Sequence, residues 1–285
     1  MNAKELSLLL PLPTAADSKF SRGTVGFVTG SNTYPGAALL GVAGAQGTSV
    51  GFVRHVGPQR VGDLLLLAHP EVVTARSIAE SGPAQAWVIG SGVARGAAEL
   101  EQVRLALQTA EVAVADAGAL ALLAETKKPE TAAWILTPHH GEACALLNQL
   151  SEAGRLDFAK IWHPELLDDP AAVAEAAAAI SQATGATVLL KGANTFIYAP
   201  NGESLWVGPN SHWLATAGTG DVLAGILGGI AAQNPEVAKR NWLDIARLAV
   251  ELHSAAADLA AATGAVTASA VAANIPLAIK QRFNR

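Results

Sequence analysis

A glycine-rich turn ahead of an apolar helix carries the clearest chemical signal in the sequence. Ala217 to Asp221 read AGTGD and lead into VLAGILGGI, which is apolar on every side and predicts a buried helix. Gly218 and Gly220 allow the backbone to fold so that successive N–H groups, that of Thr219 included, point at one spot. The helix dipole adds partial positive charge there. The turn therefore predicts a hole for an anion such as a phosphoryl group.

Asp221 lies beside this predicted hole, in the first turn of the helix. An acidic residue at that position also stabilises the helix dipole, and the residue alone does not decide between the two interpretations. A carboxylate next to an anion hole would repel a bound phosphate. It could, however, act as a base that takes a proton from a hydroxyl attacking phosphorus. We therefore expect phosphoryl-transfer chemistry with Asp221 as the base.

A second segment, Lys191 to Thr195, reads KGANT and follows the apolar run Val188–Leu190. It places a cation, a flexible glycine turn and a hydroxyl side by side, a set that could hold the phosphates or ribose of a nucleotide. The alternative interpretation is an ordinary lysine that reaches solvent at the end of a strand.

A third segment, Leu136 to Glu142, reads LTPHHGE and also follows an apolar run. Its two histidines are adjacent, so they would not face one way on a helix, and a paired metal site is not expected. We interpret His139 as a substrate contact through a hydrogen bond, and Glu142 as an organiser of metal-bound water. The alternative is that Thr137 and Glu142 simply begin a helix.

The elements that position these segments follow from apolar runs that alternate with helical stretches. The runs are continuous, which is typical of strands covered on both faces, and intervening helices indicate βαβ units and a mostly parallel sheet. Asn201-Gly202 between two β-prone runs predicts a hairpin. The predicted strands are 24–29, 48–53, 86–89, 112–115, 132–136, 187–190, 195–199 and 204–207. One helix is predicted to start at Pro35, and another to run from near Arg95 to Thr109. Further predicted helices span 171–183, 221–233, 242–263 and 269–285.

Composition excludes several classes of function. Lys and Arg number 19 against 24 Asp and Glu, and no run of basic residues provides the stripe that a general nucleic-acid binder needs. No stretch of about 18 uncharged apolar residues predicts a membrane span. The single cysteine, Cys144, excludes an internal disulfide and a cysteine zinc site, which is typical of the cytoplasm. No linker or internal repeat divides the chain, so residues 1–285 are expected to form a single domain.

Together the segments resemble the ribokinase-like superfamily, and most closely the NAD(P)H-hydrate dehydratases. The family's motifs occur here in the family's order: GSNTYPGAA at 30–38, then LTPHHGE, KGANT and AGTGD. Kinase branches of the superfamily usually have asparagine where His139 stands. The resemblance implies an α/β fold, a ribokinase-like three-layer αβα sandwich with a mostly parallel central sheet and a β-hairpin.

The resemblance also implies a reaction. A nucleotide, ADP in bacterial enzymes and ATP in eukaryotic ones, phosphorylates the ring hydroxyl of the S-form of hydrated NADH or NADPH. Phosphate then leaves, which restores the ring double bond, and ADP is released as AMP. Mg²⁺ would bridge the nucleotide phosphates and be held mainly through waters and the phosphates themselves. No protein ligand is assigned, and Glu142 is the one candidate for a contact through water. Implied catalytic residues are Asp221, Gly218, Thr219 and Gly220; implied nucleotide contacts are Lys191, Gly192, Ala193, Asn194, Thr195 and Gly220; implied substrate contacts are Ala38, Gly92, His139 and Asp221.

Further expectations concern neighbours and partners. The chain reads GSGVA at 90–94 where the family usually has GPGLG, and Asp116 either supports the active-site residues or caps the next helix. His253 is expected in the core or a subunit contact.

By resemblance we expect a homotetramer and a separate NAD(P)H-hydrate epimerase. The alternatives are a kinase for a thiazole- or pyrimidine-type alcohol and a non-catalytic nucleotide-binding protein.

Overall fold

A nine-stranded sheet forms the centre of the molecule. The computed structural model describes residues 7–93, 99–157 and 161–283. Across the sheet the strands run in the order β3-β2-β1-β4-β5-β6-β7-β8-β9. Their bounds are β1 Thr24–Val28, β2 Phe52–Val56, β3 Val73–Ala75, β4 Ala86–Ile89, β5 Val112–Ala115, β6 Ala133–Leu136, β7 Thr187–Leu190, β8 Thr195–Tyr198 and β9 Ser204–Val207.

Strands β1 to β7 pair in parallel, and β8 and β9 add an antiparallel hairpin at one edge. In the register, Ile89 pairs with Ala115, and Ala115 pairs with Leu136. The carboxyl ends of β4, β5 and β6 therefore lie side by side. This confirms the predicted mostly parallel sheet with a hairpin.

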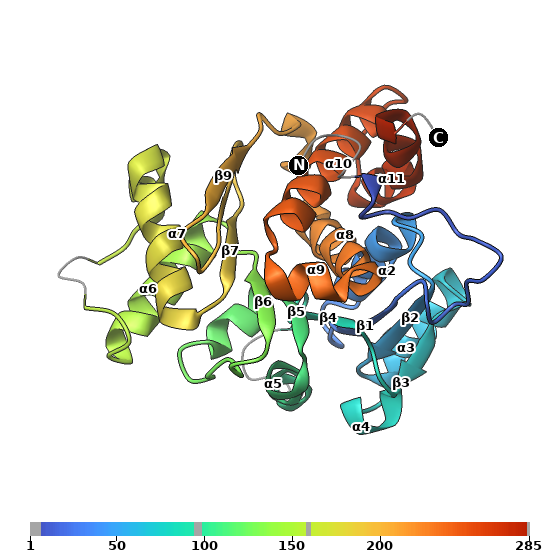
Figure 1. Ribbon diagram of the computed structural model, residues 1–285, viewed down its shortest axis with the longest axis horizontal. Helices are drawn as coiled ribbons and strands as arrows, with labels where there is room; N and C mark the ends of the chain where they lie inside the picture. The colour runs from blue at the N-terminus through green and yellow to red at the C-terminus, as the bar shows by residue number, and fades with distance from the viewer. Residues whose placement is uncertain (1–6, 94–98, 158–160, 284–285) are drawn as a thin grey trace.

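Helices cover both faces of the sheet. Their bounds are α2 Gly36–Gly47, α3 Gln59–Ala68, α4 Ile78–Ser81, α5 Leu100–Thr109, α6 His140–Glu152, α7 Pro170–Thr184, α8 Thr219–Gln233, α9 Pro235–Arg240, α10 Leu243–Ala261 and α11 Ala268–Phe283, with 3₁₀ turns η1 Ala117–Leu122, η2 Pro164–Asp168 and η3 His212–Leu214. Figure 1 shows α8 beside α2 and α10 beside α11, while α5 and α6 lie on another side of the sheet.

Alternate residues of each central strand enter two separate hydrophobic clusters. In β5, Val112 and Val114 belong to the cluster that contains residues of α2, α8, α10 and α11, whereas Ala113 and Ala115 belong to the cluster that contains residues of α5, α6 and α7. A strand that is apolar at every position can satisfy both layers at once, because successive side chains point to opposite faces. The result is the predicted three-layer αβα sandwich.

Helices α2 and α8 pack so closely that their backbones touch through glycine. A Cβ built on Gly225 would lie 2.0 Å from the carbonyl oxygen of Gly41, and one on Gly44 would lie 2.4 Å from the carbonyl oxygen of Val222. Only glycine permits this approach, which explains the glycines inside an otherwise buried apolar helix.

One predicted strand, 48–53, is displaced in the structure, where β2 begins only at Phe52. Thr48 instead closes helix α2, with its Oγ1 donating to the carbonyl oxygen of Ala45 at 2.7 Å, and Ser49 turns the chain with a φ of 63°. Strand β3 and helices α3, α4 and α9 were not predicted. The expected helix start at Arg95 and helix end at Arg285 lie outside the described residues.

Candidate active site

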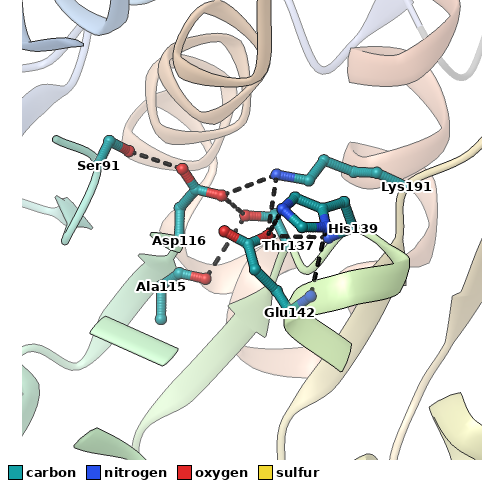
Figure 2. Close-up of polar contacts among 7 residues, drawn as sticks. All are labelled: Ser91, Ala115, Asp116, Thr137, His139, Glu142 and Lys191. Carbon is teal, nitrogen blue, oxygen red and sulfur yellow. Dashed lines mark hydrogen bonds and ion pairs between the residues drawn. The ribbon is translucent and has the colours of Figure 1, made fainter. Parts of the chain in front are cut away.

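The active-site groups come from loops that follow neighbouring parallel strands. Asp116 follows β5, Thr137 follows β6 and Lys191 follows β7, while Ser91 lies just beyond β4. An isolated bridge between His139 and Lys191 extends the pairing past β6 and β7. Because carboxyl ends of parallel strands share one edge, residues far apart in sequence converge there, as Figure 2 shows.

Asp116 lies at the centre of this group and is 3% exposed. Its Oδ2 accepts a hydrogen bond from Ser91 Oγ at 2.9 Å, and its Oδ1 accepts one from Thr137 Oγ1 at 2.8 Å. Lys191 Nζ donates to the same Oδ1 at 3.0 Å. A buried carboxylate is costly unless its oxygens are bonded, and both oxygens are bonded here. Asp116 is the N-cap of η1 but its side chain makes no capping bond, so the first of the two expectations describes it.

Lys191 is the cation at this edge of the sheet. Its Nζ lies 3.0 Å from Asp116 Oδ1 and 3.8 Å from Glu142 Oε2. Burial alone would lower the pKa of Lys191, but the carboxylates of Asp116, Glu142 and Asp221 together raise it above its ordinary value. The lysine is therefore charged at neutral pH and available to an anionic ligand.

The predicted glycine turn adopts the required backbone. Gly218 is the N-cap of α8 with a φ of 89°, and a Cβ built there would lie 2.5 Å from Leu40 Cδ1 and 3.9 Å from Asp221 Oδ2. A Cβ on Gly220 would lie 3.5 Å from Lys191 Nζ. The turn, the Asp221 carboxylate and the lysine ammonium thus lie together, at the end of the helix where the dipole favours an anion.

Thr219 contributes to the turn through hydrogen bonds of its side chain and its amide to nearby carbonyl groups. Its Oγ1 donates to the carbonyl oxygens of Leu214 and Thr216, and its amide donates to the Thr216 carbonyl at 3.3 Å. The side chain therefore fixes the turn. The role of the Gly218, Thr219 and Gly220 amides as an anion hole stays a prediction.

Asp221 has a strongly perturbed carboxyl group. Burial and the nearby Asp116 carboxylate raise its pKa, Lys191 opposes them, and Glu142 adds a further rise, to about 6. A carboxylate of ordinary pKa is a weak base, so this shift brings Asp221 closer to the value that suits a general base near neutral pH. Perturbed carboxyl groups are typical of catalytic sites, and Asp221 directly follows Gly220, which lines the cavity described below, although Asp221 itself is not part of that lining.

His139 and Glu142 begin helix α6 as a reciprocal pair. The Glu142 amide donates to His139 Nδ1 at 3.3 Å, and the His139 amide donates to Glu142 Oε2 at 2.9 Å. Glu142 therefore starts a helix, as the alternative interpretation held, and the same carboxylate also faces Lys191 (Figure 2).

A cavity of about 470 Å³ opens beside this cluster. Its lining includes Lys191, Thr219 and Gly220 together with the apolar side chains of Leu214, Leu223 and Val250. The predicted site residues that line it are His139, Lys191, Gly192, Ala193, Thr195, Thr219 and Gly220. Asn194 instead lies against the backbone at Gly208, where a Cβ would approach its Oδ1 within 2.5 Å.

The predicted substrate contacts Ala38 and Gly92 lie elsewhere along the sheet edge. Gly92 has a φ of 70°, and a Cβ there would lie 2.4 Å from Ala37 Cβ and 2.9 Å from the Tyr34 carbonyl oxygen. Ala38 is fully buried in α2. The Gly30 amide donates to the Ser91 carbonyl at 2.7 Å, which joins the 30–38 loop to the 90–93 loop. These residues form a wall separate from the lining of the cavity.

Among the cavity-lining residues that sequence reasoning did not place in the site are Asn210 and His253. Asn210 Nδ2 donates to the Gly192 carbonyl and to Thr195 Oγ1, so it holds the predicted nucleotide turn in place. His253 is buried as expected but also lines the cavity, and burial lowers its pKa to about 4 despite a backbone hydrogen bond to Thr219, so it is neutral. Both residues come from elements distant in sequence, and no local motif marks them.

The carboxylates do not form a ready-made metal cage. No group of three or more His, Cys, Asp or Glu side chains within residues 7–93, 99–157 and 161–283 could hold an ion. Asp116, Glu142 and Asp221 nevertheless surround a single lysine, which leaves an acidic surplus. This donor set fits a hydrated Mg²⁺ held mainly by waters and phosphates, since Mg²⁺ dehydrates reluctantly.

Comparison with solved structures defines the class of protein. A ribokinase-like superfamily protein from Enterococcus faecalis superimposes with a TM-score of 0.78 at 22% identity, over 100% of this chain and 96% of that one. An ADP/ATP-dependent NAD(P)H-hydrate dehydratase from Bacillus subtilis, co-crystallised with ATP/Mg²⁺, superimposes with a TM-score of 0.77 at 25% identity, over 99% and 97%. The chain therefore has the ribokinase-like fold.

Sequence comparison then identifies the family. The family model described as NAD(P)H-hydrate dehydratase matches residues 25–277, and the chain belongs to that family. It is 33% identical over 282 residues to the ADP-dependent (S)-NAD(P)H-hydrate dehydratase of Neisseria meningitidis serogroup B, covering 95% of this chain and 88% of that protein. It spans only 45% of the length of other relatives, the bifunctional NAD(P)H-hydrate repair enzymes of Mycobacterium tuberculosis. No helix in the described part of the chain is long and apolar enough to span a bilayer.

Proposed function

We propose that residues 1–285 act as one ADP-dependent NAD(P)H-hydrate dehydratase domain. In the proposed reaction the ring hydroxyl of (S)-hydrated NADH or NADPH attacks the terminal phosphorus of ADP, and AMP leaves. Asp221 takes the hydroxyl proton. The phosphate ester then breaks at its carbon–oxygen bond, a neighbouring carbon loses a proton, and the ring double bond returns. Phosphorylation makes this elimination possible because phosphate is a far better leaving group than hydroxide.

The observation that carries the proposal is the position of Asp221. Its carboxylate lies beside the Gly218 turn, its pKa is raised to about 6, and Lys191 Nζ lies next to Gly220 on the other side of the turn. A base, an anion-binding helix end and a cation at one point are the parts that phosphoryl transfer needs. The adjoining cavity, with Lys191 to Ala193 and Thr195 in its lining, supports a nucleotide site there, and the wall at Ala38 and Gly92, with His139, supports a site for the hydrated cofactor.

A magnesium ion, when bound, would neutralise charge on the nucleotide phosphates. Glu142 would hold it through water, because its carboxylate lies 3.8 Å from Lys191 Nζ, which lines the cavity, and Mg²⁺ prefers oxygen ligands and keeps much of its water. The binding of the phosphates themselves falls to Lys191 and to amides in the first turn of helix α8, where the helix dipole favours an anion.

The test is turnover of prepared NADH hydrate with Mg²⁺ and either ADP or ATP. Recovery of the absorbance of reduced nicotinamide, with one AMP and one phosphate released per NADH from ADP, supports the proposal. Asp221→Asn should abolish turnover while nucleotide affinity, measured by calorimetry, persists. Asp258→Asn, the same change at an exposed position of α10, is the matched control and should leave turnover unchanged.

The same assay separates the kinase alternative. A kinase would give no recovery of NADH with either nucleotide and would convert a thiazole- or pyrimidine-type alcohol into a stable phosphate ester. Nucleotide binding without either reaction would indicate a non-catalytic binding protein.

Companions of the reaction are also part of the proposal. The relatives that are about twice as long are named as bifunctional repair enzymes, which supports a second repair activity acting with this one. We propose a separate NAD(P)H-hydrate epimerase as that companion, a homotetramer as the assembly and the cytoplasm as the compartment. Light scattering tests the assembly, and addition of an epimerase should extend turnover to the R-form of the hydrate.

A further inference from the structure

Lys191 has three carboxylates around it but is bonded to only one of them closely. Its Nζ lies 3.0 Å from Asp116 Oδ1 and 3.8 Å from Glu142 Oε2. Among the described residues no ion pair joins it to Asp221, although Asp221 is near enough for its charge to act on the lysine. The lysine is thus bonded to Asp116 and not to the proposed base.

This choice of partner matters for catalysis. A lysine has a flexible four-carbon stem, and its ammonium could turn to whichever carboxylate is free. An ion pair between Lys191 and Asp221 would stabilise the ionised carboxylate and weaken it as a base. The same pair would also occupy the ammonium and withdraw it from the phosphates of the nucleotide.

The bonds around Asp116 are built to prevent that exchange. Ser91 Oγ holds Oδ2 at 2.9 Å, and Thr137 Oγ1 holds Oδ1 at 2.8 Å, so the carboxylate cannot rotate without breaking a bond (Figure 2). The remaining contact of Oδ1 is Lys191 Nζ. Ser91 stands where the family pattern usually has proline, and proline has no hydroxyl to donate.

We propose that Asp116, fixed by Ser91 and Thr137, is a positioning residue that holds the Lys191 ammonium beside Gly220 and away from Asp221. It keeps the cation available to the nucleotide phosphates and keeps the base unpaired. The inference rests on the proposed function, since it assigns the nucleotide phosphates to this end of the cavity.

Asp116→Asn is the direct test. With the ionic partner removed, Lys191 should turn to Asp221. We expect kcat roughly tenfold lower, because base catalysis is weakened but not removed, and a KM for ADP several-fold higher, because the ammonium is occupied. Simple removal of a negative charge would instead lower the KM for an anionic nucleotide. An unchanged or lower KM for ADP would therefore overturn the proposal.

The pH dependence gives a second readout that requires no turnover. The charged groups that act on Asp221 are Asp116, Lys191 and Glu142, and neutral His253 lies on the adjoining helix. Carboxyl ¹³C NMR, assigned with Asp221→Asn, should show Asp221 titrating at lower pH in Asp116→Asn than in wild type. In Lys191→Met it should titrate at higher pH. Loss of the Asp116 charge by itself lowers the pKa of Asp221, so the deciding variant is Ser91→Ala, which keeps every charge. Asp221 should titrate at lower pH in Ser91→Ala than in wild type, and an unchanged titration would contradict the proposal even if wild type turned over no NADH hydrate.

Two further variants complete the design. Glu111→Gln is the matched control, because Glu111 precedes the same strand β5 and also pairs with a lysine, Lys239, at 2.9 Å. It should change neither KM nor the Asp221 titration. If Asp116→Asn does not fold, Ser91→Ala removes only the Oδ2 bond and should shift both quantities in the same directions by a smaller amount. No shift in Ser91→Ala would then refute the inference.

Discussion

Replacing Asp221 by asparagine should make the protein more stable at neutral pH while it abolishes activity. Folding places this carboxyl where its pKa rises from 3.8 to about 6, chiefly through burial and the Asp116 carboxylate. The unfolded chain therefore releases its proton at lower pH than the folded chain does. Each unit of pKa shift corresponds to about 1.4 kcal/mol, so the ionised group costs the folded state roughly 3 kcal/mol.

Because the pKa of Asp221 is raised by folding, the pH range over which the free energy of unfolding changes can be stated. Below pH 3.8 the carboxyl is protonated in both states and costs nothing. Between that value and about 6 the wild-type protein loses stability as the pH rises, and above about 6 the full cost is present. Asparagine is neutral throughout, so the stability difference between variant and wild type should grow over this window and then remain constant.

Urea denaturation at a series of pH values, with unfolding followed by circular dichroism, measures the difference directly. At pH 7 the variant should gain about 3 kcal/mol in free energy of unfolding, or several degrees in Tm. Asp258→Asn, at an exposed position, should show no gain that depends on pH. A stability difference that stays flat between pH 4 and pH 7, or a variant less stable than wild type at pH 7, would refute the reasoning.

Three further predictions follow from the same geometry. The pH profile of kcat/KM in the NADH-hydrate assay should fall below pH about 6, because Asp221 must be ionised to accept a proton; a flat profile from pH 5 to 8 would exclude it as the base. Gly218→Ala should cost about 1–3 kcal/mol in urea denaturation and reduce turnover, since a Cβ would meet Leu40 at a φ of 89°; Gly202→Ala has the same φ in open space and should cost less. Gly225→Ala should cost at least about 2–3 kcal/mol, because its Cβ would overlap the Gly41 carbonyl oxygen; a near-neutral result would show that α2 and α8 separate easily.

The central sheet could be predicted because its strands are apolar on both faces and separated by clear helical stretches. Strand β3 could not, because it is a three-residue edge strand whose first residue is exposed and carries no continuous apolar run. The shift of β2 has a local cause: Thr48 was interpreted by its β propensity, but its hydroxyl closes the preceding helix. Tertiary and capping contacts override propensity at such ends.

The residues of the candidate site also divide into those that could be predicted from the sequence and those that could not. Lys191, Asp221 and the glycine turn belong to contiguous motifs, so their neighbours in sequence reveal their chemistry. Asn210 reaches the Gly192 carbonyl only because the β8–β9 hairpin returns the chain to that turn, and His253 enters the cavity from α10. Such contacts depend on the path of the chain, which no local spacing encodes.

The glycine contact between α2 and α8 also limits how the enzyme can move. Helix α2 begins in the loop proposed to hold the damaged cofactor, and α8 begins at the turn that carries Asp221. Because the Gly41 and Val222 carbonyls touch the facing glycine backbones, neither helix can slide or rotate past the other. In the proposed function, this contact would hold the loop before α2 and the Asp221 turn at a fixed distance from each other, so the acceptor hydroxyl and its base would be positioned before a nucleotide binds.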